Sequence, residues 1–202
     1  NIGLHAAKTT NKAVVIFQLE MSREQLVMRL LAIESMVDGK KMAVCPVCGG
    51  ESVEWTILPQ ISKAQDLAPG HYYLAEDQVN NTRYYQVDKN ANICLYLNGK
   101  DILSSKRAFY VAGGATLTIM GTKESTVSGT AVDETDVRGI ALDTSGGTIN
   151  VLGGTYPQIA ARNVAFLRTS GSVLNIYEGT LMQGVDNVIE SGVKDLSIKV
   201  GK

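Results

Sequence analysis

Cys45 and Cys48 are the residues of this sequence best suited to holding a metal ion. Cys45-Pro-Val-Cys48 is followed by Gly49-Gly50, and the tight turn expected there points two thiolates at one tetrahedral ion. A complete site needs two more ligands, and beyond the first 38 residues only His71 and Cys94 can supply them. Cys94 lies in an apolar run, where a buried thiol is the ordinary interpretation. The sequence predicts a zinc half-site at Cys45 and Cys48, and an incomplete site or a dithiol without metal is the open alternative.

Acidic residues are the next candidates for chemistry, because enzymes that cleave polysaccharides use paired carboxylates, or calcium beside an arginine or lysine. No recognisable pair falls within a repeat of the chain. The cluster Asp133-Glu-Thr-Asp136 can supply calcium ligands, and solvated loop charge is its alternative. The carboxylates considered are Glu124, Asp133, Glu134, Asp136, Asp143, Glu178, Asp186, Glu190 and Asp195.

Arginines and tyrosines offer a binding surface rather than a reaction centre. Arg107, Arg138, Arg162 and Arg168 recur at corresponding points of the repeats, which predicts an outward ladder that contacts acidic glycan or only protects the sheet. Tyrosines can stack on sugar rings or simply pack. The tyrosines considered are Tyr72, Tyr73, Tyr84, Tyr85, Tyr96, Tyr110, Tyr156 and Tyr177.

Composition narrows the classes of function. The formal net charge is −1 and the isoelectric point is near 6.2, so no overall basic field would recruit nucleic acid or anionic lipid. No apolar run reaches the roughly 18 residues of a membrane span. Because the chain begins at Asn1 without a basic and apolar leader, we expect a fragment whose signal peptide, if any, lies upstream.

The first 38 residues have the pattern of an α/β nucleotide-binding core. The run 13–19 is continuous, apolar and β-branched, which is typical of a strand covered on both faces. Ser22 and Gln25 form a capping box, and Leu26 and Leu30 give the following helix its buried face. The sequence predicts a helix–strand–helix fragment over residues 1–38.

This segment resembles replicative DNA helicases of the DnaB type. The matching residues are Asn1-Ile2, His5-Ala-Ala7, the strand 13–19, Leu19-Glu-Met21, Glu24-Gln-Leu26 and Met28-Arg29. The resemblance implies part of a RecA-like ATPase core in which Glu20 would polarise the attacking water. The chain has Gln18 where the family usually has serine, and it contains no G-x-x-x-x-G-K-[ST] loop to cradle phosphates. We therefore expect Glu20 to be inactive and nucleic acid to be an unlikely partner of this fragment.

A two-part motif recurs in the rest of the chain. Its second part is apolar-x-apolar followed closely by glycine, and its first part is an apolar pair some seven to nine residues upstream. Successive Leu or Ile positions are 22, 32, 25 and 22 residues apart. The second parts are Leu95-Tyr-Leu-Asn-Gly99, Leu117-Thr-Ile-Met-Gly121, Ile149-Asn-Val-Leu-Gly153, Leu174-Asn-Ile-Tyr-Glu-Gly179 and Leu196-Ser-Ile-Lys-Val-Gly201, and the first parts are Ala108-Phe109, Gly139-Ile140, Ala165-Phe166 and Val188-Ile189.

Coils of this period cannot enclose a core alone, but stacked coils share one. The sequence therefore predicts a mainly β protein whose residues 55–202 form a right-handed parallel β-helix (solenoid), joined to the α/β fragment 1–38 by a linker, 39–54, with the CPVCG knuckle. The long interval predicts a loop insertion or an extra short strand near 125–128. A β-sandwich is the rival fold. Inward-pointing side chains are expected at Leu117, Ile119, Ile149, Val151, Leu174 and Ile176.

The repeats resemble the pectin-lyase-like β-helix domains of large bacterial surface proteins. The residues that carry the resemblance are Gly70-His-Tyr-Tyr-Leu74, Leu95–Gly99, Ala115–Gly121, Gly147–Thr155 and Val173–Thr180. It implies a non-catalytic structural or adhesive module at the cell surface, whose partner is a glycan or a surface protein. Two alternatives stay open, namely a helicase fragment, which would be cytoplasmic and ATP-dependent, and a polysaccharide lyase or hydrolase. A helicase segment before a β-helix also predicts a chimera, natural or from a joining artefact.

Overall fold

A computed structural model describes residues 40–49, 52–61, 65–80, 84–105, 107–129, 140–157, 163–184, 188–192 and 197–200. All regular structure in these ranges is β-strand. Within the same ranges, no helix has the length and apolar character needed to cross a membrane. The helix–strand–helix predicted for residues 1–38, with Glu20, lies outside the described residues.

The chain divides into two compact units, Asn1–Glu54 and Trp55–Lys202. The described part of the first unit contains β1 (Lys40–Val44) and a turn at residues 46–48, and β2 (Ser52–Ile57) begins in this unit and continues into the second. The segment 39–54, expected as a linker, thus carries strand structure. Strand β2 is hydrogen-bonded to both β1 and β4 (Gly70–Tyr73).

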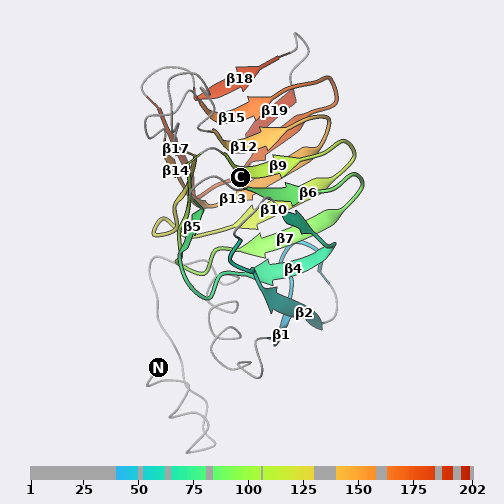
Figure 1. Cartoon of the computed structure of the whole chain (residues 1–202), viewed down its shortest axis with the longest axis vertical. Helices are drawn as coiled ribbons and strands as arrows, with labels where there is room; N and C mark the ends of the chain where they lie inside the picture. The colour runs from blue at the N-terminus through green and yellow to red at the C-terminus, as the bar shows by residue number, and fades with distance from the viewer. Residues whose placement is uncertain are drawn as a thin grey trace, which may run out of the picture. The chain divides into compact units, whose positions relative to one another are not determined.

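The second unit is a parallel β-solenoid, as Figure 1 shows by the successive strands stacked over one another. Strands that lie one coil apart in the chain are neighbours in the same sheet, because each coil stacks on the one before it. Sheet A continues from β2 and β4 through β7 (Asn92–Tyr96), β10 (Thr116–Met120), β13 (Thr148–Leu152), β16 (Val173–Ile176) and β19 (Ser197–Val200). Sheet B contains β3 (Gln65–Leu67), β6 (Tyr85–Val87), β9 (Arg107–Val111), β12 (Ile140–Thr144), β15 (Asn163–Leu167) and β18 (Ile189–Ser191).

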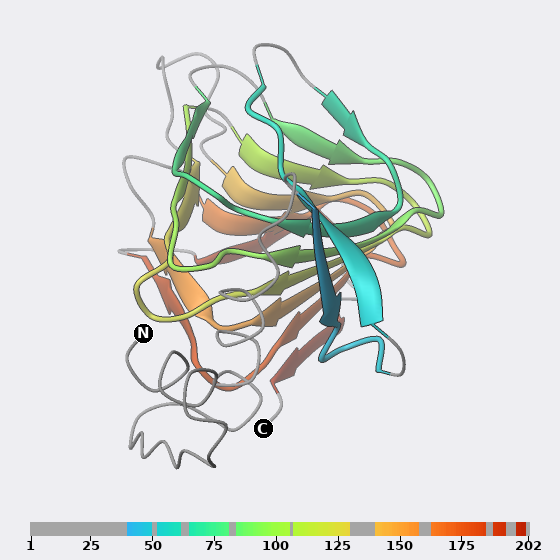
Figure 2. The same ribbon diagram turned by 90° about the horizontal axis from the view of Figure 1, so that it is seen from below.

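Short strands form the third side of the coils. They are β5 (Gln78–Asn80), β8 (Ile102–Ser104) and β11 (Val127–Gly129) in one sheet, and β14 (Gly154–Pro157) and β17 (Thr180–Gln183) in another. Viewed along the stack in Figure 2, the sheets surround one interior. Strand β11 pairs in parallel with β8, so the extra strand predicted near 125–128 is present. Residues 130–139 of the same interval lie outside the described residues.

The inward-pointing positions predicted for sheet A are confirmed. Leu117 is in register with Ile149, and Ile149 with Leu174; Ile119, Val151 and Ile176 form the second inward column. Five of these six side chains are buried, and Ile176 is partly buried against the same core. Because β10 and β13 pair in parallel, the β-sandwich with hairpins is excluded.

The register predicted at both ends of sheet A is wrong by two residues. Leu117 pairs with Ile93 rather than Leu95, and Leu174 pairs with Ile198 rather than Leu196. A shift of two residues keeps the same side chains inward, so the apolar pattern cannot detect it. The glycine alignment caused the first error, since Leu97, not Gly99, donates its N–H to the carbonyl of Met120 at the end of β10.

The apolar pairs predicted for the first face also align differently. Phe109 is in register with Leu142 and Ala165, rather than with Ile140 and Phe166. Phe166 instead stands in the column of Tyr110 and Asp143, next to Glu190. A one-residue shift reverses the face that a side chain occupies, so Phe166 leaves the core and becomes part of the outer surface of sheet B.

The core is mainly apolar, and two tyrosines are among its largest buried side chains. Tyr85 stacks on Phe109 with 5.6 Å between ring centroids, and its hydroxyl donates to the carbonyl of Pro59 at 2.7 Å. Tyr156 is wholly buried, and burial raises the pKa of its hydroxyl far above the ordinary value. These two tyrosines are packing residues and not sugar-stacking platforms.

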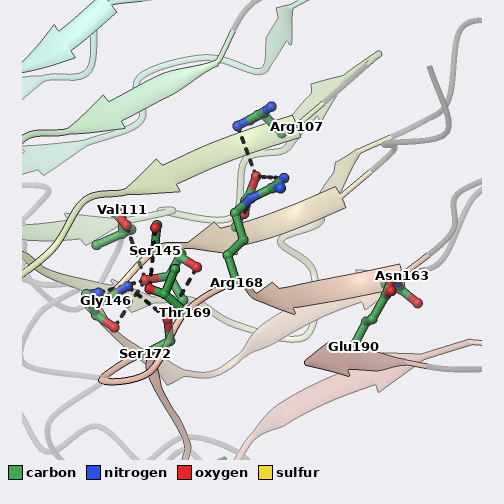
Figure 3. Close-up of polar contacts among 12 residues, drawn as sticks. Arg107, Val111, Ser145, Gly146, Asn163, Arg168, Thr169, Ser172 and Glu190 are labelled. Carbon is green, nitrogen blue, oxygen red and sulfur yellow. Dashed lines mark hydrogen bonds and ion pairs between the residues drawn. The ribbon is translucent and has the colours of Figure 1, made fainter. Parts of the chain in front are cut away.

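Coil corners approach so closely that some of them require glycine. Gly153 has a φ of +90°, and a Cβ atom there would collide with the carbonyl oxygen of Gly121. At the corner after β12, the Gly147 N–H donates to Thr144 Oγ1 at 3.1 Å, and the Gly146 N–H donates to Ser172 Oγ at 2.8 Å (Figure 3). The corner at residues 145–147 is thus hydrogen-bonded both within its own coil and to the next coil.

Candidate metal centre

Strand pairing alone brings a histidine and a cysteine together on sheet A. Ile93 and Leu95 of β7 point into the core, so Cys94 between them faces outward. His71 on β4 is the register partner of Cys94. Adjacent strands lie about 4.8 Å apart, which places the imidazole and the thiol within reach of one ion.

Further residues of the same outward column contact one another on both sides of His71 and Cys94. On one side, the Trp55 ring lies tilted against the His71 ring with 5.1 Å between centroids, and Trp55 is 2% exposed. On the other side, Thr118 follows Cys94 in register, and Asn150 Nδ2 donates to Thr118 Oγ1 at 3.1 Å. Asn175 Nδ2 in turn donates to Asn150 Oδ1 at 2.7 Å. Ring packing on Trp55 therefore restricts His71, and the hydrogen-bonded polar side chains continue the same column beyond Cys94.

The CPVCG segment makes the tight turn that its sequence predicts. Cys45 directly follows β1, and the Gly49 N–H donates to the Cys45 carbonyl at 3.0 Å. Gly49 has a φ of +68°, which glycine adopts without strain. Cys45 is buried and Cys48 is exposed.

Four potential ligands converge: one atom from each of Cys45, Cys48, His71 and Cys94 lies within 4.8 Å of the others. Around a tetrahedral zinc ion, sulfur and nitrogen ligands stand roughly 3.3–3.8 Å apart, given bond lengths of about 2.3 and 2.0 Å. The separations of the four ligand atoms, all within 4.8 Å, are thus only slightly larger than those around a bound zinc ion. Three sulfurs and one imidazole nitrogen suit zinc rather than calcium or magnesium, which prefer oxygen ligands. The cluster can bind a metal such as zinc.

The local sequence predicted only half of this centre. Cys45 and Cys48 are two residues of one turn and were visible from their spacing. His71 and Cys94 were named only as the remaining partners, and the expectation that Cys94 is a buried thiol is confirmed, since the residue is 7% exposed. The signal that could have assigned Cys94 to the site is the alternation Ile93-Cys94-Leu95, which turns the thiol away from the core.

A second polar cluster lies on the outer surface of sheet B, around Asp143. This carboxylate is 0% exposed and accepts hydrogen bonds from Arg168 Nε at 2.6 Å and Arg168 Nη2 at 2.7 Å (Figure 3). It also forms an ion pair with Arg107 Nη1 at 2.9 Å. Arg107 also lies over the rings of Tyr84 and Tyr110, 4.8 and 5.6 Å from their centroids. The hydrogen bond to Asp143 raises the pKa of Arg168 above its ordinary value, against the opposing effect of burial.

This cluster changes the meaning of the predicted arginine ladder. Arg107 and Arg168 do share one face, but both form ion pairs with Asp143, whose single negative charge compensates one of their two positive charges. Arg138 and Arg162 lie outside the described residues. The described part of the ladder is therefore a clamp across β9, β12 and β15 rather than an open cationic strip.

The carboxylates do not make an evident catalytic pair in the described residues. Asp143 and Glu190 stand in one outward column with Phe166 between them. Asp143 is wholly buried and clamped, and Glu190 Oε2 accepts a hydrogen bond from Asn163 Nδ2. Glu124 and Glu178 are exposed in turns. The candidates Asp133, Glu134, Asp136, Asp186 and Asp195, and with them the proposed calcium cluster, lie outside the described residues.

Comparison with known proteins gives one partial similarity. The family model of the DnaB-like helicase C terminal domain matches residues 1–86, which is less than half of the chain. This confirms the similarity noted for residues 1–38 and extends it over β1 to β5. No curated protein and no solved structure matches the chain. The matched residues nevertheless include β2, β3, β4 and β5, which are strands of the solenoid sheets.

Proposed function

We propose that the chain is a non-catalytic β-solenoid module whose first coils are stabilised by one zinc ion on Cys45, Cys48, His71 and Cys94. The observation that carries the proposal is the convergence of these four ligand atoms within 4.8 Å. A zinc ion with four protein ligands has no open position for water or substrate, which is typical of structural rather than catalytic sites. When bound, the ion supplies cross-linking of the turn to the sheet.

The residues of the chain prepare this site in two ways. Cys94 and His71 are held by the register of β4 and β7, so little conformational freedom is lost when they bind. The tilted Trp55 ring restricts the imidazole, as outer contacts of metal-binding histidines commonly do. Metal binding requires the three thiols to lose their protons, so affinity should rise with pH.

In its wider setting, the module would be structural or adhesive. Solenoids present long, regular surfaces to partners, and the outer columns of sheets A and B carry such a surface here. We infer a pectin-lyase-like, right-handed solenoid of a bacterial surface protein, with a glycan or a surface protein as partner. A glycan array and a pulldown from cell envelopes test this, and absence of binding in both would contradict the adhesive role.

The helicase alternative rests on the family match to residues 1–86. Against it, the sequence has no phosphate-binding loop, and the matched range contains the solenoid strands β2 to β5. Titration calorimetry with ATP and magnesium decides between the two, since the module proposed here should give no heat of binding.

The zinc proposal is tested by metal analysis of the purified full chain. We expect one zinc per chain, and removal with a chelator should lower the melting temperature by about 5–10 °C, as expected for a ligand worth about 3 kcal/mol. Cys45→Ser, His71→Ala and Cys94→Ser should each lose most of the zinc. His5→Ala, which alters the other histidine of the chain, is the matched control and should keep it. A wild-type chain that binds no zinc in dialysis would overturn the proposal.

A further inference from the structure

We propose that this metal centre is controlled by oxidation: peroxide converts Cys45 and Cys48 to a disulfide and the zinc ion is released. This inference rests on the zinc site proposed above. It concerns the regulation of that site and not its existence.

The two thiols of the turn lie close together but differ in their exposure to solvent. Cys48 is exposed, whereas Cys45 is 0% and Cys94 is 7% exposed. A peroxide in solution therefore reaches Cys48 first. The second thiol needed to complete a disulfide is close, because the sulfur of Cys45 lies within 4.8 Å and only two residues separate the cysteines.

Cys94 is a less suitable partner for Cys48. It sits in the middle of β7, between Ile93 and Leu95, and parallel pairing with β4 and β10 holds the backbone on both sides. Disulfides require a specific Cα separation and side-chain direction, which a turn can adjust more easily than a central strand. The geometry therefore favours the pair within the turn.

The oxidation balances with hydrogen peroxide as the only co-reactant. The Cys48 thiolate attacks one peroxide oxygen, the O–O bond breaks, and hydroxide leaves while a sulfenic acid forms. The Cys45 thiolate then attacks Cys48 Sγ, so the S–S bond forms and a second hydroxide leaves. Two protons from solvent convert the hydroxides to water. The thiolate pair loses two electrons and the peroxide gains them.

Oxidation removes two of the four donors. His71 and Cys94 remain on their strands as a two-ligand site, which holds zinc far less tightly than four ligands do. A reducing thiol restores the dithiol, so the change is reversible when zinc is supplied.

The test treats the zinc-loaded full chain with a small excess of hydrogen peroxide and follows zinc release with a chromogenic chelator. We expect release of one zinc per two thiols lost, a Cys45–Cys48 disulfide on peptide mass mapping, and rebinding after dithiothreitol and zinc. A disulfide that contains Cys94, or zinc retained while Cys48 is oxidised, would overturn the proposal. A chain that holds no zinc before peroxide is added would overturn the zinc site and this inference together. A chain that holds zinc but fails either test above would overturn only the oxidation proposal, so the two failures can be distinguished.

Two substitutions separate the roles of the ligands. Cys48→His keeps four potential ligands but cannot form the disulfide, and its zinc release should slow at least tenfold. Cys94→His keeps the turn dithiol and should release zinc as fast as the wild type. If Cys48→His does not bind zinc, the mapped disulfide of the wild type still decides the question. Equal release rates in both zinc-bound variants would contradict the proposed pair.

Discussion

A single buried carboxylate joins three neighbouring strands of sheet B. Asp143 on β12 binds Arg107, which begins β9, and Arg168, which directly follows β15. The side chains of the arginines keep 20% and 24% exposure, while Asp143 has none. Such a cluster adds little net stability over an apolar one, but breaking it is costly because charges are left without partners. Its clearest role is to fix the relative position of successive coils.

Replacing this carboxylate should therefore destabilise the solenoid without changing its fold. Asp143→Asn removes the charge that both guanidinium groups share, and we expect a loss of about 1–3 kcal/mol, since their remaining exposure lets water compensate in part. Urea denaturation measures the change. Glu178→Gln, in an exposed turn, is the control and should shift stability by less than about 0.5 kcal/mol. Equal effects of the two substitutions would mean that the cluster does not hold the coils.

At the scale of strands, the sequence predicts which side chains of a strand face the core better than it predicts which residues of neighbouring strands pair. Alternation of apolar and polar residues identified Leu117, Ile149 and Leu174 as inward, and the structure agrees. It could not tell Ile93 from Leu95 as the partner of Leu117, because both face the core. The same limit applied to the metal centre. The Cys45–Cys48 spacing is local, whereas the meeting of His71 with Cys94 depends on the register of β4 and β7.

Because all coils share one core, a substitution at one inward position should affect the folding of the whole solenoid. Leu174 is 1% exposed and lies between Ile149 and Ile198 in register. Leu174→Asp places an unpaired charge in this core and should unfold the solenoid. Leu181→Asp makes the same chemical change at a side chain that is 44% exposed, and should leave the circular dichroism spectrum and cooperative melting unchanged. A folded Leu174→Asp chain would contradict the common core.

At the scale of the whole molecule, the thiol ligands and the β-helix resemblance favour different compartments. Exposed thiols such as Cys48 persist where glutathione keeps thiols reduced, whereas proteins outside the cell commonly form disulfides. The resemblance to surface β-helices favours export instead. Under the oxidation proposed above, export would empty the zinc site and a reducing compartment would keep it filled. Zinc content of the chain isolated from each compartment distinguishes these settings.

Two nested deletions measure what the N-terminal residues contribute to the zinc content and the melting temperature of the solenoid. Removing residues 1–39 retains Cys45 and Cys48, so we expect full zinc content and an unchanged melting temperature. Removing residues 1–54 also removes both cysteines, and should abolish zinc binding and lower the melting temperature to that of the chelator-treated full chain. Metal analysis and calorimetric melting measure both. A large fall in melting temperature after removal of residues 1–39 alone, with zinc retained, would show instead that the helicase-like segment covers the first coil, because the terminal coil of a solenoid otherwise exposes its core.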